Sequence, residues 1–600
     1  MNKKIGEIRP SQFISTFGPG SVVELPDFSV IIAGLDEWET QLCTTIPEPR
    51  LTRKLGLQKI LSLPFPKSES SFSDHLPTVP AFRFPIFYVC PNCRRLAPYK
   101  QFSVENDGVY CFNNRLKNHE PCLRVKTFPV RFVTACENGH LSDVPWNYYV
   151  HQGTSECKGD LYLEDTAKTG AISDINVKCQ KCGDSRSLQD AFQKDTNDKP
   201  PLGKCFGSRP WLGKHAQEPC DQSLRILLRG ASNLYFSVIE SALALPQFEN
   251  PISKVVSEIS ERLSKINSID TLQLLIENGA YPELEKFDLK EVFDCILEQR
   301  SDGKSEYIDL LGPEFKAITQ GNQSSKEHHF ETQFEEVPEA FQPFLSNLIM
   351  VRRLKEVRVL KAFTRINPPP DTTTLLSGDS EESGSSVLEA AISKKNLLWR
   401  PGVETHGEGI FISLNEETLQ RWEEENLDYE EEMNLNYLKY CEDRNIPEDE
   451  RAAFPGIRYM LLHTLSHSLM RQLCLNSGYS SSSLRERIYS RRGNDKNEHM
   501  AGILIYTATP DSEGSLGGLV ELGKKQNFHN VLWKALEEAR LCSSDPLCAE
   551  HKPESVGDLN GAACHSCMLA AETSCERSNR FLDRSLLVKT VSNLDIHFFR

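Results

Sequence analysis

The sequence predicts an α+β multidomain protein with zinc-ribbon-like N-terminal modules, a helical middle and a C-terminal α/β domain that carries a zinc-binding cysteine cluster. Three observations predict this fold class. The chain has 600 residues, which is too many for a single hydrophobic core. Its 19 cysteines include CxxC pairs with further cysteines at zinc-ligand separations. Strand-like apolar runs occur near both ends, whereas the middle repeats apolar residues at helical spacing.

The composition is that of a globular chain without a membrane segment. Hydrophobic residues make up 39% and charged residues 25% of the chain, which are ordinary values. The formal charge of -16 argues against a protein whose whole surface coats nucleic acid, although it permits a local basic groove. No run approaches about 18 apolar residues, and MNKKIGEIRPSQF lacks the apolar core of a secretory signal. We therefore expect a cytoplasmic protein with no membrane partner.

In a reducing compartment the cysteines are more readily explained as metal ligands than as disulfides. Zn²⁺ is the cofactor that CxxC pairs and distant cysteines favour. We interpret the isolated cysteines as small buried hydrophobic residues: Cys43, Cys295, Cys441 and Cys474.

Composition shifts divide the chain into five expected parts. The clearest boundary is NPPPDTTTLLSGDSEESGSS, because its Pro, Ser, Gly and acidic residues leave little to bury. In the first part, SVVELPD and SVIIAGL predict two strands. The parts are a β-rich segment over 1–81, a tandem zinc-ribbon-like region over 82–230, a mainly helical region over 231–366, a flexible linker or loop over 367–390 and the C-terminal domain over 391–600.

The first zinc ribbon follows RFPIFYVCPNCRRL, a strand that leads into a CxxC pair. Two hairpin tips that give two ligands each would form this site. We assign it Cys90, Cys93, Cys111 and Cys122. Cys136 and His140 follow at i, i+4 spacing. They either replace one of these ligands or are a buried cysteine and a hydrogen-bonded histidine at the Gly139 turn.

The second ribbon begins at the CxxC pair of VKCQKCGDS. Its spacing, C-x2-C-x22-C-x14-C, again suits two pairs of ligands. We assign it Cys179, Cys182, Cys205 and Cys220, with Cys157 as a spare.

Basic residues concentrate at a few places in this acidic chain. Arginines precede two aromatics in DQSLRILLRGASNLYF, an order that suits a single-strand groove but also an ordinary element with a solvated arginine face. IMVRRLKEVRVLKAFTR is the densest basic stretch and predicts an amphipathic helix or a strand pair. The candidate phosphate contacts are Arg225, Arg229, Arg352, Arg353, Arg485, Arg487 and Arg491.

The C-terminal domain opens with an acidic helix pair and a long helix, GIRYMLLHTLSHSLMRQLCLNS, which ends at Gly478. His463 and His467 share one face of that helix. HTLSH lacks the glutamate of HExxH, so packed or hydrogen-bonded histidines are favoured over a hydrolytic zinc site. GILIYTA predicts a buried strand, and the glycine loop after it suits ligand binding better than catalysis. HNVLWKALEEARLC predicts an amphipathic helix that leads to the last cysteines.

The final cluster has five cysteines for four tetrahedral positions. It comprises Cys542, Cys548, Cys564, Cys567 and Cys575. The spacing favours Cys564, Cys567 and Cys575, with either Cys542 or Cys548 as the fourth ligand. Three zinc ions per chain follow from the three clusters.

Several segments carry a resemblance to known families. GIRYMLLHTLSHSLMRQL, GYSSSSLRERIY, GILIYTATPDSEGSLGGL and ACHSCMLAAETSCERSNRFLDR resemble the zinc-binding domain that ends MrfA-type DNA-repair helicases. RPSQFISTFGPGSVVELPD, FVTACENGHLSDVPW and RPWLG with RGASNLYF resemble the DrmB subunits of the DISARM anti-phage defence system. The resemblance spans nearly the whole chain. The repair helicases have four cysteines in their final cluster, whereas this chain has five.

The resemblance implies a subunit without its own motor that joins a separate DrmA-type helicase in restricting phage DNA. Such complexes bind unmethylated DNA with single-stranded ends and work beside methyltransferases. The sequence agrees, because it has no GxxxxGK[ST] loop to hold ATP. We expect a non-catalytic DNA-binding subunit. The alternatives are a nuclease or phosphodiesterase near His463, His467 and the 511–518 loop, and a zinc-stabilised scaffold that contacts protein only.

Overall fold

The computed structural model describes most of the chain. The described residues are 8–64, 79–105, 107–113, 121–165, 171–193, 200–246, 252, 255–256, 259–263, 266–300, 308–321, 329–369, 389–444, 446–448, 451–493, 498–507, 518–553, 558–592 and 594–600.

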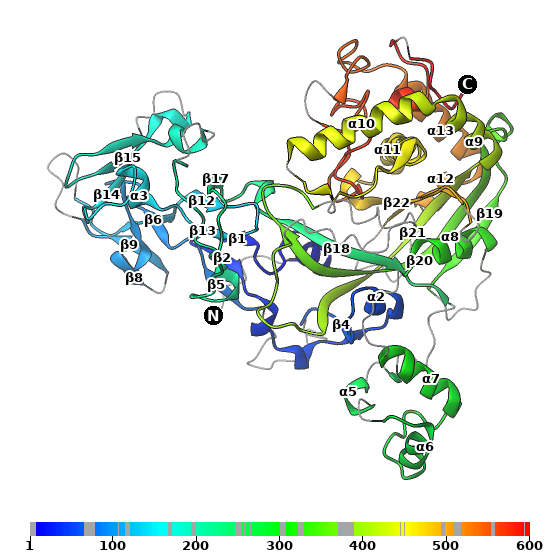
Figure 1. The fold of residues 1–600 in the computed structure, drawn as a ribbon, viewed down its shortest axis with the longest axis horizontal. Coiled ribbons are helices and arrows are strands. Elements are labelled where there is room, and N and C mark those ends of the chain that lie inside the picture. The colour runs from blue at the N-terminus through cyan, green and yellow to red at the C-terminus, as the bar shows by residue number, and fades with distance from the viewer. Residues whose placement is uncertain are drawn as a thin grey trace.

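An eight-stranded sheet forms the centre of the molecule (Figure 1). Along its main path the strands are ordered β18-β20-β21-β23-β22, with β19 beside β20 and with β3 and β4 beside β21. Strands β4 and β21 pair in parallel, and the other pairs of this sheet are antiparallel. The strands are β3 (Thr45–Ile46), β4 (Lys59–Leu61), β18 (Phe236–Leu243), β19 (Glu331–Glu335), β20 (Leu345–Thr364), β21 (Trp399–Leu414), β22 (Leu484–Arg491) and β23 (Met500–Thr507).

Two long strands, β20 and β21, join the halves of the chain. They span 20 and 16 residues and pair from Leu345 opposite Leu414 to Val359 opposite Gly402. The predicted domain boundary at 367–390 is therefore wrong, because the segments on its two sides are neighbouring strands of one sheet. The basic stretch over 349–364 is part of one strand rather than a helix or a strand pair. Residues 370–388 lie outside the described part.

Helices cover both faces of this sheet, as the alternation of side chains along β23 requires. Ile503 and Ile505 pack in the hydrophobic core that also contains the apolar residues of the long helix α11 (Gly456–Ser477). Leu504 and Tyr506 point to the other face and pack with α8 (Leu311–Gln320). Because successive strand residues point to opposite faces, burial of both faces explains why GILIYT is a continuous apolar run. The predicted buried strand is confirmed, since every residue of β23 is buried.

Helix α11 lies among the other C-terminal helices (Figure 1), and every residue from Ile457 to Met470 is buried, so this part of the helix is covered on all sides. It ends where Gly478 takes the left-handed conformation, with φ +76°, as the sequence predicts. The helices around α11 are α9 (Glu416–Glu425), α10 (Leu427–Asp443), α12 (Gly518–Leu522) and α13 (Lys525–Ala539). The predicted acidic helix pair is confirmed as α9 and α10, and the predicted amphipathic helix before the last cysteines is confirmed as α13.

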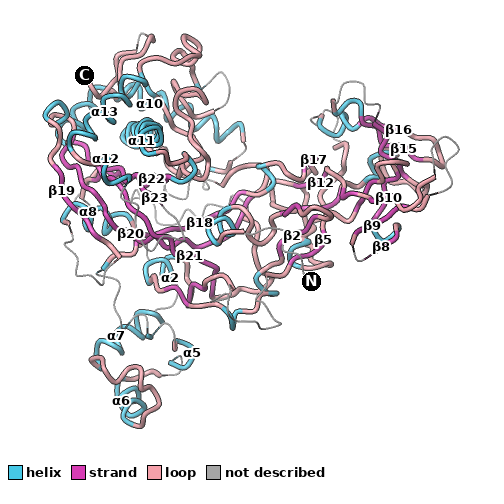
Figure 2. Tube along the Cα trace, turned by 180° about the vertical axis from the view of Figure 1, so that it is seen from behind, coloured by secondary structure: helices cyan, strands magenta, loops and turns pink. Residues whose placement is uncertain are grey.

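The helical middle is a small unit with its own core, apart from the sheet (Figures 1 and 2). It contains α5 (Ser260–Leu263), α6 (Ile269–Glu277) and α7 (Leu289–Arg300). The predicted helical region over 231–366 is only partly helical, because β18, β19 and β20 also belong to it. These strands complete the sheet of the C-terminal domain, so that domain is assembled from sequence on both sides of 367–390.

The first 81 residues are divided between two sheets. The predicted strands form an antiparallel hairpin, β1 (Val22–Glu24) with β2 (Ser29–Ile32), next to β5 (Ala81–Arg83). Strand β4 instead adds to the edge of β21 in the large sheet. Helices α1 (Pro10–Ser15) and α2 (Pro49–Lys54) also belong to this segment.

The zinc-ribbon-like region lies at the opposite end of the molecule from the C-terminal helices (Figure 2). It contains a six-stranded sheet, ordered β11-β6-β7-β14-β15-β16, and two three-stranded sheets, ordered β10-β9-β8 and β13-β12-β17. Its elements are β6 (Phe87–Val89), β7 (Arg95–Pro98), β8 (Ser103–Glu105), β9 (Gly108–Cys111), β10 (Val125–Lys126), β11 (Phe128–Pro129), β12 (Phe132–Ala135), β13 (Leu141–Asp143), α3 (Trp146–Val150), β14 (Leu161–Asp165), β15 (Ile175–Cys179), β16 (Ser185–Ser187) and β17 (Arg225–Leu228).

The architecture confirms the predicted α+β class with N-terminal ribbon-like modules and a C-terminal cysteine cluster. Among the described helices, none combines the length and the apolar character that crossing a bilayer requires.

Gly407 in β21 tests the close packing of the sheet centre. A Cβ atom at this position would lie 1.7 Å from the carbonyl oxygen of Thr507 in β23, a backbone atom that cannot yield locally. We expect Gly407→Ala to lower the free energy of unfolding by about 1–3 kcal/mol or more, seen as a lower thermal midpoint in calorimetry. Gly230→Ala is the control, because its Cβ would meet nothing closer than 3.7 Å. An unchanged midpoint for Gly407→Ala would contradict this packing.

Candidate metal centres

Among the residues that the structure describes, four groups made up of cysteine and histidine side chains alone converge in the fold. Within each group the potential ligand atoms all lie within 4.8 Å of one another. We name them the ribbon tetrad (Cys90, Cys93, Cys111, Cys122), the central tetrad (Cys136, His140, Cys205, Cys220), the outer tetrad (His151, Cys157, Cys179, Cys182) and the C-terminal tetrad (Cys542, Cys548, Cys564, Cys567).

The ribbon tetrad brings together the four residues assigned to it from the sequence. Cys90 and Cys93 lie after β6, while Cys111 ends β9 and Cys122 precedes β10. The Sγ atoms of Cys90 and Cys122 are 3.7 Å apart, as are those of Cys93 and Cys111. Four sulfurs bound to one zinc at about 2.3 Å would be separated by about 3.8 Å along a tetrahedron edge. The group therefore fits a tetrahedral zinc ion, whereas disulfides would need separations of about 2 Å.

The predicted second ribbon is wrong in its grouping. The structure brings Cys179 and Cys182 to Cys157, which the sequence left as a spare, and to His151, which it missed. Strand pairing causes this, because β15 carries Cys179 against β14, and the segment before β14 holds His151 and Cys157. The Sγ atoms of Cys157 and Cys179 are 3.6 Å apart, and His151 Nε2 is 3.3 Å from Cys182 Sγ.

Cys205 and Cys220 instead join Cys136 and His140. Cys136 and His140 lie in the turn between β12 and β13. Cys136 Sγ is 3.3 Å from His140 Nδ1 and 3.9 Å from Cys220 Sγ. The open question about Cys136 and His140 is thus answered by position, since they neither replace a ribbon ligand nor stand alone. The sequence contains four successive pairs of potential ligands in this part of the chain, which is enough for two metal sites. In the structure the first pair shares a site with the fourth, and the second shares a site with the third. The sequence-based assignment had combined only the third pair with the fourth.

The histidines of these two tetrads are oriented as metal ligands usually are. A ligating imidazole typically donates its second N–H to a carboxylate or carbonyl oxygen. His140 faces the cysteines through Nδ1, and its Nε2 lies 2.6 Å from Glu218 Oε1. His151 faces Cys182 through Nε2, and its Nδ1 lies 2.7 Å from the carbonyl oxygen of Asn147.

The C-terminal tetrad includes both loop cysteines and excludes Cys575. Helix α13 leads to Cys542, whose Sγ is 3.5 Å from that of Cys564, while Cys548 Sγ is 3.7 Å from that of Cys567. The expectation that Cys575 is a ligand here is wrong. It lies instead beside His463, with its Sγ 3.1 Å from Nε2 of that histidine. Cys575 follows the CxxC pair closely in sequence, but the turn after Met568 carries it to helix α11.

Hydrogen bonding between two cysteines favours one thiolate in the ribbon tetrad and one in the C-terminal tetrad, while it raises the pKa of the second cysteine of each pair. Hydrogen bonding from Cys90 is the main reason that the pKa of Cys93 is lowered to about 5. Hydrogen bonding from Cys567 likewise lowers the pKa of Cys548 to about 5, and the buried guanidinium of Arg584 acts in the same direction. The thiolate is the form that binds a metal, so each of these tetrads contains a cysteine prepared to ionise.

Three of the seven candidate phosphate contacts are engaged inside the protein, and their assignment is wrong. Alternation along β22 places all three on the face that α8 and β18 cover, because they are separated by even numbers of residues. Their side chains are no more than 15% exposed. Each pairs with a carboxylate: Arg485 with Glu356 at 3.3 Å, Arg487 with Glu314 at 2.6 Å and Arg491 with Asp309 at 2.9 Å.

The other four arginines differ in exposure. Arg229 is 12% exposed and is held by Glu24 at 2.9 Å and by the carbonyl oxygen of Pro129, so its assignment as a phosphate contact is also wrong. Arg225 is 56% exposed, although it pairs with Glu137. Arg352 and Arg353 are both exposed on β20. The large sheet holds β20 and a separate sheet holds β17, so the exposed arginines form two groups.

The structure offers no support for a nuclease site at His463 and His467. Both side chains are 0% exposed, so a phosphodiester cannot reach them, and residues 511–517 of the glycine loop lie outside the described part.

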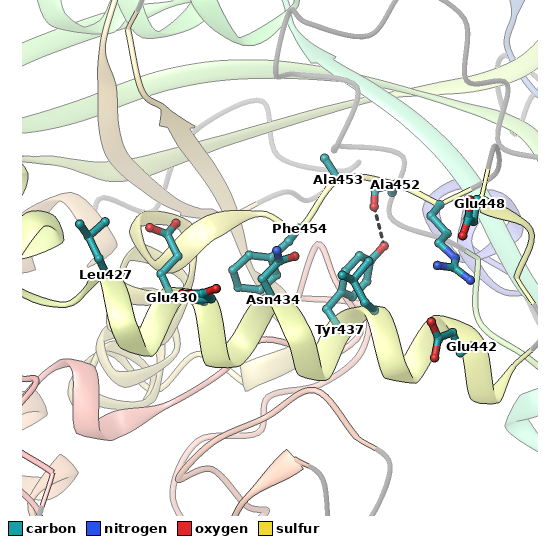
Figure 3. Close-up of a pocket in the computed structure, with 12 residues that line it drawn as sticks. Leu427, Glu430, Asn434, Tyr437, Glu442, Glu448, Ala452, Ala453 and Phe454 are labelled. Atoms are coloured by element: carbon teal, nitrogen blue, oxygen red, sulfur yellow. Dashed lines mark hydrogen bonds between the residues drawn. The ribbon is translucent and has the colours of Figure 1, made fainter.

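A surface depression lies along α10 (Figure 3). Four glutamates line it, with Arg451 as its one cation, and the hydroxyl of Tyr437 donates to the carbonyl oxygen of Ala452 at 2.8 Å. The glutamates are Glu430, Glu431, Glu442 and Glu448. This acidic lining would repel a phosphate group.

Paired cysteine substitutions test the grouping of the central and outer tetrads. We expect Cys157→Ser with Cys179→Ser to remove one zinc ion per chain, because both belong to the outer tetrad. Cys179→Ser with Cys205→Ser is expected to remove two, because those cysteines serve different tetrads. Zinc per chain is measured by mass spectrometry on desalted protein, with Cys474→Ser as the control. A loss of one ion from the second pair would restore the grouping predicted from the sequence.

Comparison with known proteins assigns the chain to a family. Residues 9–236 match a domain of unknown function, DUF8724, and residues 465–568 match the MrfA Zn-binding domain. That second match contains the C-terminal tetrad, and together with the sulfur-rich ligand sets it identifies zinc as the metal. The DISARM protein DrmB of Bacillus paralicheniformis is 33% identical over 594 residues, which cover 95% of this chain and 98% of that protein. The chain therefore belongs to the DrmB family of DISARM proteins.

Proposed function

We propose that this chain is a non-catalytic, DNA-binding subunit of an anti-phage defence system and that it pairs with a separate helicase subunit. Membership of the DrmB family supports the role in defence. The proposal of DNA binding rests on the uneven distribution of charge along the chain. Residues 82–230 contain 21 Lys and Arg against 16 Asp and Glu, whereas the whole chain has a net charge of -16. A positive unit in a negative protein directs a polyanion to one region.

The zinc-ribbon-like region also exposes aromatic side chains among its cations. Phe112, Phe128 and Phe206 are each more than half exposed. Arg225 is exposed next to the central tetrad, of which Cys220 is a member. Exposed rings can stack on the bases of a single strand while cations meet its phosphates. This combination supports recognition of DNA with single-stranded ends.

A β-bulge gives a second basic feature on the large sheet. Between Val351 and Leu354 the register of β20 against β21 shifts, so two arginines stand opposite one residue. Regular alternation would bury one of the two side chains, but Arg352 and Arg353 are both exposed. Arg353 is 64% exposed and lies 3.8 Å from Glu331, a long and weak ion pair. This pair of arginines is therefore well placed to contact phosphate.

Substitution of the bulge arginines tests DNA binding. We expect Arg352→Ala with Arg353→Ala to weaken binding to a fluorescent duplex with a single-stranded overhang. The slope of log K against log salt should fall by about 1–2, since each lost phosphate contact removes about one unit. Fluorescence anisotropy across a salt series measures both quantities. Arg421→Ala is the control, because Arg421 is exposed on the acidic helix α9. If the wild-type protein binds no DNA, the protein-only scaffold replaces this proposal.

The helicase contact is proposed for the rim of the C-terminal tetrad. Leu541 and Leu547 immediately precede Cys542 and Cys548, and they are 68% and 83% exposed. Apolar side chains fixed in solvent by a metal-bound loop are suited to a protein partner. A partner on this rim would leave the positive zinc-ribbon-like region free for DNA.

Polar substitution of this rim tests the helicase contact. We expect Leu541→Ser with Leu547→Ser to reduce co-purification of a co-expressed DrmA-type helicase several-fold without any loss of zinc, because neither side chain is a ligand. Leu435→Ser is the control, since Leu435 is 59% exposed on α10. Undiminished co-purification by the double variant would move the contact elsewhere, while DNA binding by the isolated subunit is scored separately.

A further inference from the structure

Four polar side chains from three distant segments meet inside the C-terminal domain. They are His463 and His467 of α11, Glu486 of β22 and Cys575 of the loop after the C-terminal tetrad. Each offers one ligand atom, and these atoms lie within 4.8 Å of one another. The side chains of both histidines and of Glu486 are 0% exposed, and Cys575 is 9% exposed. The group is separate from the four tetrads described above.

Three separations within this group, of 3.1 to 3.5 Å, are close to the edges of a small tetrahedron. His463 Nε2 lies 3.1 Å from both Cys575 Sγ and Glu486 Oε1, and His467 Nε2 lies 3.5 Å from that same carboxylate oxygen. A zinc ion with nitrogen and oxygen ligands at about 2.0–2.2 Å and sulfur at about 2.3 Å gives edges of roughly 3.3–3.6 Å. The i, i+4 spacing on α11 places both imidazoles on the same side of the helix.

Hydrogen bonds orient His467 and Cys575 toward the common centre, whereas Nδ1 of His463 has no hydrogen-bond partner among the described residues. Nδ1 of His467 lies 2.8 Å from the carbonyl oxygen of Met568, which leaves Nε2 directed inward. This is the arrangement found in His140 and His151. The Sγ atom of Cys575 accepts the backbone N–H groups of Arg577 and Asn579 at 3.4 and 3.2 Å. The contact of His467 leaves the lone pair of Nε2 free, and a thiolate that accepts two N–H groups retains a third lone pair for a metal ion.

Unsatisfied atoms point to a missing positive charge at the centre. His467 Nε2 and Glu486 Oε2 are buried without a hydrogen-bond partner among the described residues. A buried polar atom without a partner costs about 1–3 kcal/mol, and more if it is charged. A divalent ion bound by His467 Nε2 and by one oxygen of Glu486 would give the nitrogen a partner and would balance the charge of the buried carboxylate. With one thiolate, one carboxylate and two neutral imidazoles, the bound site would carry no net charge and would be inexpensive to bury.

We propose that His463, His467, Glu486 and Cys575 form a fifth zinc site, distinct from the C-terminal tetrad. Imidazole, thiolate and carboxylate together at tetrahedral separations suit Zn²⁺. Four protein ligands fill the coordination shell, so the site is structural. It joins the buried helix α11 to β22 of the large sheet and to the C-terminal loop. The match to the MrfA Zn-binding domain covers residues 465–568 and therefore includes neither His463 nor Cys575.

The site has a direct test in the zinc content of the full-length protein. Wild-type protein is saturated with Zn²⁺, desalted and analysed by mass spectrometry. We expect five zinc ions per chain. His467→Asn and Cys575→Ser should each remove one ion and leave the others. His529→Asn is the matched control, because His529 lies on α13 outside every ligand group. X-ray absorption should also show a lower sulfur share per zinc than four sulfur-rich tetrads alone would give.

The wild-type count decides the question even if a variant fails to fold. Four ions per wild-type chain would overturn the fifth site. Five ions that persist in both His467→Asn and Cys575→Ser would also overturn it. Five ions that fall to four in both variants, with no change in His529→Asn, would establish it.

Discussion

The pairing of β20 with β21 is the constraint on which the rest of the C-terminal domain depends. These strands are separated by 34 residues in sequence, from 365 to 398, yet they pair over most of their length. Strands β18 and β19 add to β20, whereas β4 and β23 add to β21. The register therefore decides which residues face α11 and which face α8. A slip of one residue would exchange these two faces, and the side chains of each core would then meet the wrong helix.

Metal coordination stabilises the fold in the parts of the chain that have little apolar surface to bury. The ribbon-like region has short strands, and its cores are packed around the proposed ligands themselves, with Cys90, Cys111 and Cys122 fully buried. A structural zinc contributes folding free energy directly, so such loops need no large core. In the large sheet, by contrast, side-chain packing on both faces provides the stability. The C-terminal domain is stabilised both by side-chain packing and by metal coordination, since its tetrad directly follows the well-packed helix α13.

Burial decides which arginines stabilise the fold and which remain available to bind a ligand. On β22 they neutralise Glu314, Glu356 and Asp309 inside the protein, where loss of either partner would leave an uncompensated charge. On β20 the bulge at Arg352 turns two neighbouring arginines outward. The same residue type therefore stabilises the core on one strand and stays available to a ligand on another. The positive zinc-ribbon-like region and the exposed arginines are consequently the surfaces to which the proposed DNA contacts are confined.

The sequence by itself determined the local features: the first ribbon's four cysteines, the strands β1 and β2, the buried strand β23 and helix α11 with its glycine end. Each of these follows from spacing or periodicity within a short stretch. Only the tertiary structure decided that Cys205 joins Cys136, that Cys575 joins His463 and that Arg487 is buried against Glu314. Coordination and ion pairing act through space over a few ångströms. Which distant residues come that close depends on strand pairing, and no local pattern records the pairing of strands far apart in sequence.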